Sequence, residues 1–280
     1  MRFMRPYVTG DSHGDTNEFK LRLRGFLKWE LHASPEDMQA VRVPEGEDIW
    51  MIILGDFGGN FYGGTHKQDI EFKQLLQNSN INYFVLRGNH DQRPSKIMTA
   101  AAWHTEKLFG GLVYVENRFP NIHYATDCPE VYEICGFKTL VLPGAYSVDK
   151  KWRLKYEQDY GEKIWFHDEQ MNEGERAMAL QLCKDNDNKF DVVLSHTCPW
   201  NYIPRYSPNL AKKGIIQSDI DMTMEHLFDD IDNKIEYKAW FYGHHHDDTQ
   251  TQRGGRYQIC LYERIVDFED AVKNGIFKTY

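Results

Sequence analysis

The amino-acid sequence predicts an α/β layered fold, and three observations support this. Short runs rich in β-branched, leucine and aromatic residues end at a glycine or a polar cluster, as strands do. Helical patterns lie between several of these runs. Polar clusters recur just after the runs, where open α/β sheets place their functional sites. The expected strands cover residues 3–9, 49–54, 82–86, 131–134, 138–142, 191–195, 239–242 and 256–262, and the clearest helices cover 16–29, 67–77 and 169–185.

The composition of the 280-residue chain is that of a globular protein with a net negative charge. The formal charge of −9 argues against non-specific binding of duplex DNA and against attraction to an anionic membrane. No segment supplies the roughly 18 consecutive apolar residues of a membrane helix, and the N-terminus lacks a signal-like apolar region. We therefore expect a cytoplasmic protein. Its five cysteines lack C-x-x-C spacing, so neither a disulfide framework nor a structural zinc site is expected.

We expect one domain over residues 1–280, because the candidate site residues are spread over nearly the whole chain. The segments near 145–190 and 199–222 contain stretches dense in basic and aromatic residues or in prolines. Such segments are typical of loops or caps that cover a site.

Five polar clusters follow five of the expected strands and contain the candidate metal ligands. In an extended backbone alternate side chains point the same way, so Asp11 and His13 are expected to share one side, as are His244 and His246. Mixed Asp, His and Asn side chains suit Mn, Fe, Zn or Ni better than a thiolate site does. The clusters are GDSHG at 10–14, GDFGG at 55–59, GNHD at 88–91, SHT at 195–197 and GHHH at 243–246.

The ordered clusters resemble the motifs of the calcineurin-like metallophosphoesterases, which run D-x-H, G-D, G-N-H-D/E, H and G-H-x-H. The resemblance extends over about residues 8–248. Any one motif alone would be weak, whereas five in order are specific. The resemblance implies a four-layer αββα sandwich of two mixed β-sheets flanked by helices.

The resemblance also implies two bound metal ions, for which we favour Mn, and a role for each matching residue. His90 would lie near the substrate as a proton donor or transition-state stabiliser. Asp56 would bridge the two ions. The first ion would be bound by Asp11, His13 and His246, and the second by Asn89, His196 and His244.

The charges of these side chains agree with phosphate-ester hydrolysis. Two divalent ions carry four positive charges against two negative charges from Asp11 and Asp56, so the site attracts phosphate. A metal-bound water has a pKa near ~7, which makes hydroxide available as a nucleophile. We therefore expect a phosphatase or phosphodiesterase whose substrate is small or nucleotide-like. The alternative is an inactive scaffold of the same fold that binds a partner, and the complete ligand set argues against it.

Several nearby side chains have two interpretations. Arg87, Arg153 and Arg205 are candidate phosphate contacts, although Arg87 could equally be a structural salt-bridge partner and the other two could be solvated surface charges. Asp91 could orient His90 or cap the following helix, and we prefer the cap.

Histidine and aromatic side chains near the motifs also need an interpretation. His245 should point away from its two neighbours and serve a structural or supporting role. The aromatic residues Trp200, Tyr202 and Tyr206 could stack on a base or anchor a loop.

One departure from the family pattern narrows the function. The protein phosphatase branch continues its second motif as G-D-x-x-D-R-G, whereas Asp56 is followed here by FGGN. That branch uses the missing Asp to orient its histidine and the missing Arg to bind phosphate. Dephosphorylation of proteins is therefore not expected, and the sequence does not identify a protein partner.

Overall fold

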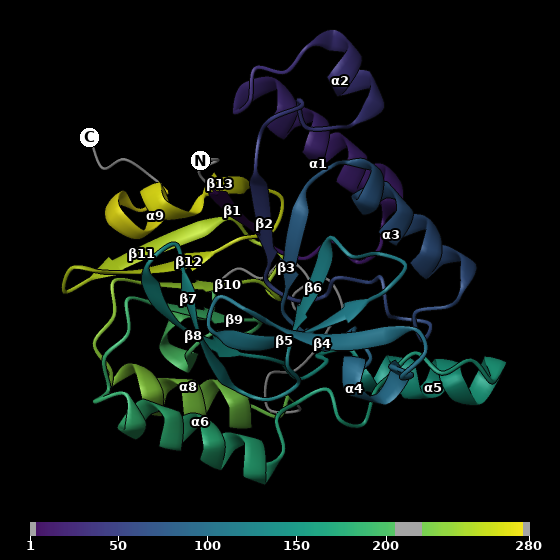
Figure 1. The fold of residues 1–280 in the computed structure, drawn as a ribbon. Coiled ribbons are helices and arrows are strands. Elements are labelled where there is room, and N and C mark those ends of the chain that lie inside the picture. The colour runs from purple at the N-terminus through teal and green to yellow at the C-terminus, as the bar shows by residue number, and fades with distance from the viewer. Residues whose placement is uncertain (1–3, 205–219, 277–280) are drawn as a thin grey trace.

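The computed structural model describes residues 4–204 and 220–276 as two packed β-sheets with helices on both outer faces (Figure 1). One sheet has seven strands and the other has six. The helices α1 (Thr16–Trp29) and α3 (Lys67–Asn78) cover the first sheet, and α6 (Glu173–Asp185) and α8 (Thr223–Asp232) cover the second. The expected four-layer αββα sandwich is thus confirmed.

Both sheets have four parallel strands in the centre and antiparallel strands at their edges. The first sheet has the order β13 (Ile265–Asp267), β1 (Arg5–Thr9), β2 (Ile49–Ile53), β3 (Asn82–Val85), β6 (Ile122–Ala125), β5 (Gly111–Glu116) and β4 (Trp103–Leu108), and β1, β2, β3 and β6 are parallel. The second has the order β11 (Thr249–Arg253), β12 (Arg256–Cys260), β10 (Ala239–Tyr242), β9 (Val192–Ser195), β8 (Phe137–Leu142) and β7 (Glu130–Ile134), and β12, β10, β9 and β8 are parallel.

Three apolar layers hold these four structural layers together. Neighbouring residues of one strand enter different layers: Tyr7 packs against the helices of the first sheet, whereas Val8 packs between the sheets. In β10, Phe241 faces the space between the sheets and Trp240 faces α8. Because both faces of the central strands are buried, most of them are continuous apolar runs, which is why all of them except β6 were recognisable in the sequence.

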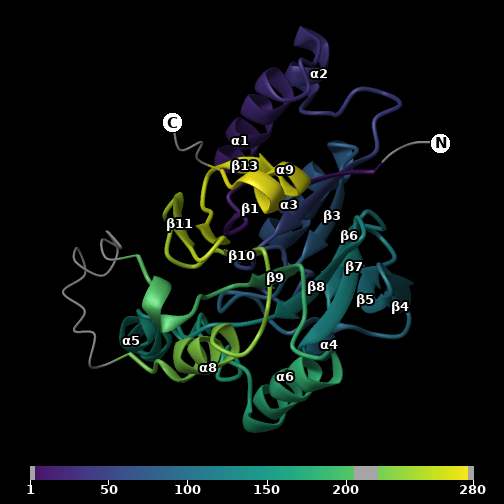
Figure 2. The same ribbon diagram turned by 90° about the vertical axis from the view of Figure 1, so that its left-hand side faces the viewer.

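The remaining helices are shorter or lie at the margins of the sheets (Figure 2). The helix α5 (Lys150–Tyr160) lies within the segment that was expected to be a loop or cap. It begins after Asp149 and ends at Gly161, which adopts a left-handed conformation. These elements are α2 (Pro35–Ala40), α4 (Pro94–Ile97), α5 (Lys150–Tyr160), the 3₁₀ turn η1 (Trp200–Tyr202) and α9 (Phe268–Asn274).

The expected strands and helices are present wherever the structure describes them, with ends shifted by a few residues. The expected helix at 169–185 begins only at Glu173, because Asn172 and Glu175 form a reciprocal capping box there. The strands β4, β5, β6, β11 and β13 were not expected. Among residues 4–204 and 220–276, no helix has both the length and the apolar character needed to cross a membrane.

Candidate metal centre

The polar clusters converge at the carboxyl ends of the central strands of both sheets. Asp11 and His13 follow β1, Asp56 follows β2, and Asn89 and His90 follow β3 in the first sheet. His196 follows β9, and His244 and His246 follow β10, in the second sheet. Because parallel strands end at the same edge, side chains separated by more than 200 residues meet there.

The backbone at this edge is left-handed rather than extended. His13, Asp56, His244 and His246 have φ values of 49°, 45°, 65° and 50°. The expectation of an extended backbone at His13, His244 and His246 is therefore wrong, although Asp11 and His13 do lie in one group of potential ligands as expected. Tight loops direct the side chains instead, and such conformations persist only where the surrounding structure enforces them.

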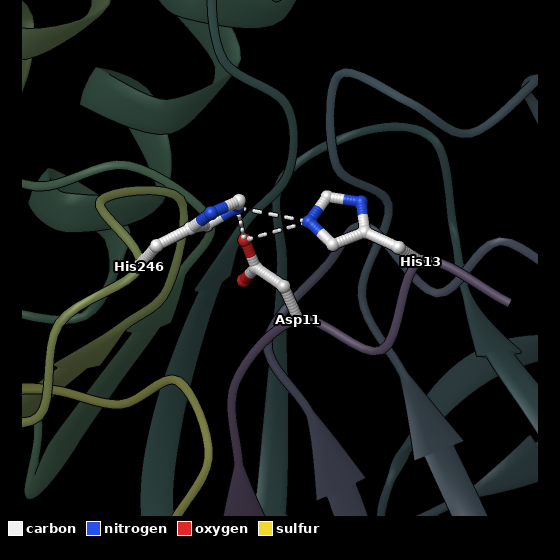
Figure 3. A group of neighbouring side chains, drawn as sticks. All are labelled: Asp11, His13 and His246. Atoms are coloured by element: carbon white, nitrogen blue, oxygen red, sulfur yellow. Dashed lines mark hydrogen bonds and ion pairs between the residues drawn. The ribbon is translucent and has the colours of Figure 1, made fainter. Parts of the chain in front are cut away.

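A first group of potential metal ligands joins the two sheets (Figure 3). The Nε2 atom of His13 lies 2.9 Å from Nε2 of His246 and 3.8 Å from Oδ2 of Asp11. Nε2 of His246 lies 3.3 Å from the same Asp11 oxygen. These three side chains offer atoms that all lie within 4.8 Å of one another. They are the three residues that the sequence assigns to the first ion.

A second group consists of Asp56, His196 and His244, whose ligand atoms also lie within 4.8 Å of one another. Nε2 of His196 lies 3.2 Å from Oδ1 of Asp56 and 2.9 Å from Oδ1 of Asn89. The other ring nitrogen of His196, Nδ1, donates to the carbonyl of Leu54 at 2.7 Å. In the neutral ring this hydrogen bond leaves the free electron pair on Nε2, as is usual for a metal-binding histidine.

A third group, formed by His13, Asp56 and His90, connects the first two. Nδ1 of His13 and Nε2 of His90 lie 3.9 and 3.8 Å from Oδ2 of Asp56. Asp56 therefore belongs to the second and third groups, while His13 belongs to the first and third.

The ionisation of these groups is mixed. Burial lowers the pKa of His196, but Asp56 and Asp11 outweigh it and raise that pKa to about 9, so a cation would have to displace a proton from this ring. Burial raises the pKa of the Asp56 carboxyl, but the imidazoles of His90, His196 and His13 outweigh it and bring that pKa well below its usual range. Burial and the neighbouring His196 hold the pKa of His244 well below that of a free imidazole, so His244 is neutral. Ionised carboxylates and neutral imidazoles are the ligand forms, and the donor set of oxygen and imidazole nitrogen fits divalent transition metals.

Two residues that the sequence analysis did not single out orient the side chain of Asn89. Its Nδ2 donates to Oγ of Ser147 at 3.0 Å. Ser147 donates in turn from Oγ and from its backbone N, at 2.5 and 3.0 Å, to the carboxylate of the buried Glu169. This chain fixes the amide so that Oδ1 faces His196. Neither residue belongs to a motif. The only sequence signal for them was their position in the segment near 145–190, which was expected to cover a site.

Asp91 has a different role from either that was expected. It accepts hydrogen bonds from the backbone N–H groups of Phe57, Gly58 and Gly88, at 3.1, 2.9 and 2.9 Å. The helix α4 begins after Arg93, and no side chain caps it. The cap interpretation is therefore wrong, because the Asp91 carboxylate joins the loops after β2 and β3 instead.

The candidate phosphate contacts separate into distinct environments. Arg87 is buried, donates to the carbonyl of Glu169 at 2.7 Å and lies 3.9 Å from Asp127, which favours its structural interpretation. Arg153 is not a surface charge, since only 8% of it is exposed. Its Nη2 lies 3.0 Å from both ring nitrogens of His90. Arg205 lies outside the described residues.

The side chain of Arg153 is held in place from two directions. Its Nε donates to Asp149 at 2.8 Å, and its Nη1 donates to the carbonyl of Ile164 at 2.7 Å. Burial lowers the pKa of His90 to about 4, and the Arg153 charge adds to this while Asp56 opposes it. A neutral His90 ring beside a fixed guanidinium can donate one N–H to an anion.

A cavity of about 660 Å³ opens beside His13, His90 and Arg153. This volume is typical of a small-molecule site. Trp200 and Tyr202 do not line it: the ring of Trp200 packs on His226, with centroids 5.2 Å apart. Tyr206 lies outside the described residues. The aromatic side chains that do line the cavity are Phe61, Tyr62, Trp152 and Tyr156.

His245 points to the opposite side of its loop from the ligand groups. Its Nε2 lies 3.3 Å from Sγ of the buried Cys198, and its ring packs near that of Tyr242. These contacts agree with the supporting role expected from its position in the HHH cluster.

The four layers and the clustered carboxylates and imidazoles define a class, that of α/β sandwich enzymes with a metal centre at the carboxyl ends of their strands. Residues 4–248 match the sequence profile of the calcineurin-like phosphoesterases. The chain therefore belongs to the calcineurin-like phosphoesterase family, a family of metal-dependent phosphoester hydrolases. A comparison with curated protein sequences gives no match.

Solved structures with related folds differ widely in sequence. The phosphopantetheinyl hydrolase of Mycobacterium tuberculosis is 12% identical, with a TM-score of 0.40, over 92% of this chain and 90% of its own. A candidate 5′-nucleotidase of Staphylococcus aureus, solved with alpha-ketoglutarate, is 13% identical, with a TM-score of 0.43, over 93% of this chain and 49% of its own. The sulfate thiohydrolase SoxB of Thermus thermophilus is 10% identical, with a TM-score of 0.41, over 94% of this chain and 52% of its own. With TM-scores below 0.5, none of these structures bears on the function of this chain.

The close approach of Gly88 to Asp56 gives a first prediction. A Cβ at Gly88 would lie 2.1 Å from Oδ1 and 2.2 Å from the backbone N of Asp56. Gly88→Ala should therefore displace Asp56 and lower metal affinity by at least roughly 10-fold, the smaller of the losses known for disturbed ligand support. Titration with Mn, followed by calorimetry, measures this. The control Gly25→Ala, on α1 with no atom within 4 Å of its Cβ, should bind Mn as the wild type does. Equal affinities in the two variants would contradict the prediction.

Proposed function

We propose that this protein is a binuclear metal-dependent hydrolase of phosphate esters. The observation that carries the proposal is that two separate groups of potential ligands, Asp11–His13–His246 and Asp56–His196–His244, lie next to each other, with Nδ1 of His13 3.9 Å from Oδ2 of Asp56. A single ion would need only one such group. Two adjacent groups with a carboxylate between them are the arrangement that two neighbouring ions require.

The ligands that we propose are those of the ordered motifs. Asp11, His13 and His246 would bind the first ion, and Asp56 would bridge to the second. Asn89, His196 and His244 would complete the second site, with the amide of Asn89 held by Ser147. The proposal is supported by the presence of every donor of both sets at one edge of the sandwich.

Bound ions would supply a water of lowered pKa as the nucleophile and positive charge to the phosphate oxygens. The protein itself would position the phosphate with His90 and Arg153. The guanidinium of Arg153 would donate to phosphate oxygens in the planar geometry that suits them. His90, held beside it, would donate a hydrogen bond as charge develops on the oxygen that leaves.

Arg153 offers a physical replacement for the arginine that is missing after Asp56. In the protein phosphatase branch that arginine follows the second motif, whereas here the cation comes from α5, about 100 residues later in the chain. Its fixed contacts with Asp149 and Ile164 mean that little side-chain entropy is lost when phosphate binds. The missing Asp–Arg pair thus argues against protein substrates without arguing against phosphate binding.

The substrate that we propose is small, with nucleotides among the candidates, because the cavity beside His90 has the volume of a small-molecule site. Both monoesters and diesters need the same nucleophile and the same positive charge. We favour Mn as the metal because the donors are carboxylate and amide oxygens together with imidazoles. A cytoplasmic location stays a prediction from the sequence.

The alternative is an inactive scaffold of the same fold. Such a protein would lack at least one metal ligand or the residues that contact the phosphate. The described donor set has no such gap, which supports the enzyme.

The deciding experiment is metal analysis of protein purified without chelator and supplemented with Mn, joined to a screen of Mn, Ni, Fe, Zn and Mg against chromogenic monoesters and diesters. Two metal equivalents and turnover support the enzyme, whereas fewer than two equivalents and no turnover would leave the scaffold.

Replacement of the shared carboxylate tests the bridge. Asp56→Asn should abolish turnover and weaken both metal sites by more than the roughly 10- to 100-fold typical of an outer-shell change, because each ion loses a charged ligand. Metal content and the hydrolysis of p-nitrophenyl phosphate esters are the measurements. Asp230→Asn makes the same change at an exposed position of α8 and should alter neither. Sustained Mn-dependent turnover in Asp56→Asn would eliminate the bridging role.

Removal of the histidine beside the cavity separates chemistry from metal binding. His90→Ala should retain two metal equivalents and lose at least roughly 10²-fold in kcat, the usual contribution of a positioned acid–base or hydrogen-bonding group. Metal analysis and steady-state kinetics with the same ester measure both. The exposed His104→Ala is the matched control. An unchanged kcat would remove His90 from the mechanism.

Exchange of the guanidinium for an ammonium tests phosphate recognition. Arg153→Lys keeps the charge but cannot contact Asp149, Ile164 and the phosphate together, so kcat/KM should fall by roughly 10- to 100-fold, the value of one or two charge-assisted hydrogen bonds. Affinity for inorganic phosphate should fall with it, while the melting temperature stays close to that of the wild type. Full kcat/KM with a lowered melting temperature would instead assign Arg153 to the support of α5.

A further inference from the structure

Two kinds of side chain line the cavity beside the metal centre. The first kind, His13, His90 and Arg153, is called the phosphate end. The second kind includes the rings of Trp152 and Tyr156, whose centroids are 5.6 Å apart, and is called the aromatic end. An ester whose phosphate contacts the phosphate end would have its alcohol portion available to the aromatic end. The aromatic end therefore bears on the identity of the alcohol.

The aromatic end is formed by neighbouring elements rather than by one loop. Trp152 and Tyr156 lie one turn apart on α5, and both are at least partly exposed. Phe61 and Tyr62, from the loop after β2, bring two further rings with centroids 4.8 Å apart. Phe61 lies 6.5 Å, between centroids, from the ring of His90, so the aromatic surface continues up to the phosphate end.

Four carboxylates line the same cavity, and three of them already have partners. Asp15 accepts hydrogen bonds from Asn17 N and Glu18 N at the start of α1. Asp69 accepts from the backbone of the loop at Tyr62 and Gly64. Glu71 forms an ion pair with Lys67 at 3.6 Å. The fourth, Glu162, accepts only a long hydrogen bond of 3.5 Å from the hydroxyl of Tyr156 and has no ion pair with any described lysine or arginine.

An exposed carboxylate among aromatic rings selects against two kinds of alcohol. An anionic group such as a second phosphate would meet the charges of four carboxylates against the one guanidinium that Arg153 provides. A neutral group would remove water from Glu162 without replacing its counter-charge, which costs free energy. A cation avoids both penalties, because ring faces and a carboxylate each attract it.

We propose that the cavity binds phosphate esters of an alcohol that carries an ammonium group, with this group against Tyr62, Trp152, Tyr156 and Glu162. The inference rests on the proposed hydrolase function and narrows its substrate class. It accounts for an acidic cavity beside a phosphate site: the carboxylates recognise the other end of the substrate. It also explains why Trp152, which lines the cavity, is left exposed on α5.

A pair of isosteric esters tests the charge alone. Phosphocholine and its p-nitrophenyl diester are compared with the corresponding 3,3-dimethylbutyl esters, in which carbon replaces nitrogen. With the Mn-loaded full chain, kcat/KM should be roughly fivefold to thirtyfold higher for the cationic member of each pair, as one cation–π contact and one partly exposed ion pair predict. Equal values, or more rapid turnover of a nucleoside 5′-monophosphate than of phosphocholine, would overturn the inference.

Matched variants locate the effect in the cavity. Glu162→Gln and Tyr156→Leu should each lower the preference for the cationic ester severalfold. Asp159→Asn and Tyr160→Leu make the same changes at exposed positions of α5 outside the cavity lining, and both should keep it. A preference that survives both cavity changes would place its origin elsewhere and reject the proposed site.

The inference and the proposed function fail in different ways. If neither ester of a pair is hydrolysed with any metal, the hydrolase fails, and calorimetric titration with choline and with 3,3-dimethylbutanol still decides the cavity. Tighter binding of choline in the wild type, lost in Glu162→Gln, supports the cationic pocket. Equal binding of the two alcohols rejects it.

Discussion

Asp56 connects the loops from which the candidate metal centre is built, through its backbone and through its buried carboxylate. Its backbone carbonyl accepts hydrogen bonds from the N–H groups of Ser12 and His13, after β1. Its side chain accepts from the N–H of His90, after β3, and lies 3.2 Å from His196, after β9. Only 1% of Asp56 is exposed, so its charge must be balanced by neighbouring groups rather than by water. One residue thus fixes the relative positions of groups from both sheets.

This arrangement requires backbone conformations that the fold must enforce. His13, Asp56, His244 and His246 all have positive φ, which costs of order 1–3 kcal/mol at each residue. The apolar layer between the sheets, with Leu54, Leu86 and Leu194 fully buried near these loops, supplies the rigid support. The site therefore lies where the most tightly packed strands end, so that strain in the loops is held by the core.

The segment from 145 to 170 completes the site from outside the motifs. Ser147 and Glu169 fix the amide of Asn89, and Arg153 approaches His90 from α5. The same segment supplies aromatic rings and Glu162 to the cavity. The motifs thus specify where the candidate metal centre lies, while a separate part of the chain supplies the lining of the cavity beside it. The arginine that is missing after Asp56 fits this picture, because Arg153 from this segment lies beside His90 instead.

The resemblance to the calcineurin-like metallophosphoesterases implied the four layers. The sequence by itself predicted an α/β layered fold, most of the central strands and the order of the polar clusters, because a strand buried on both faces is a local apolar run and each cluster directly follows one. It did not reveal β4 and β11, whose residues are largely polar and which pair only at the edges of their sheets. Only the tertiary structure decided three contacts: Asp91 accepts hydrogen bonds from backbone amides, Arg87 donates to the carbonyl of Glu169, and Arg153 lies within hydrogen-bond distance of His90. Each of these side chains has a partner tens of residues away, and the free energy of such a contact depends on burial and geometry that no local pattern encodes.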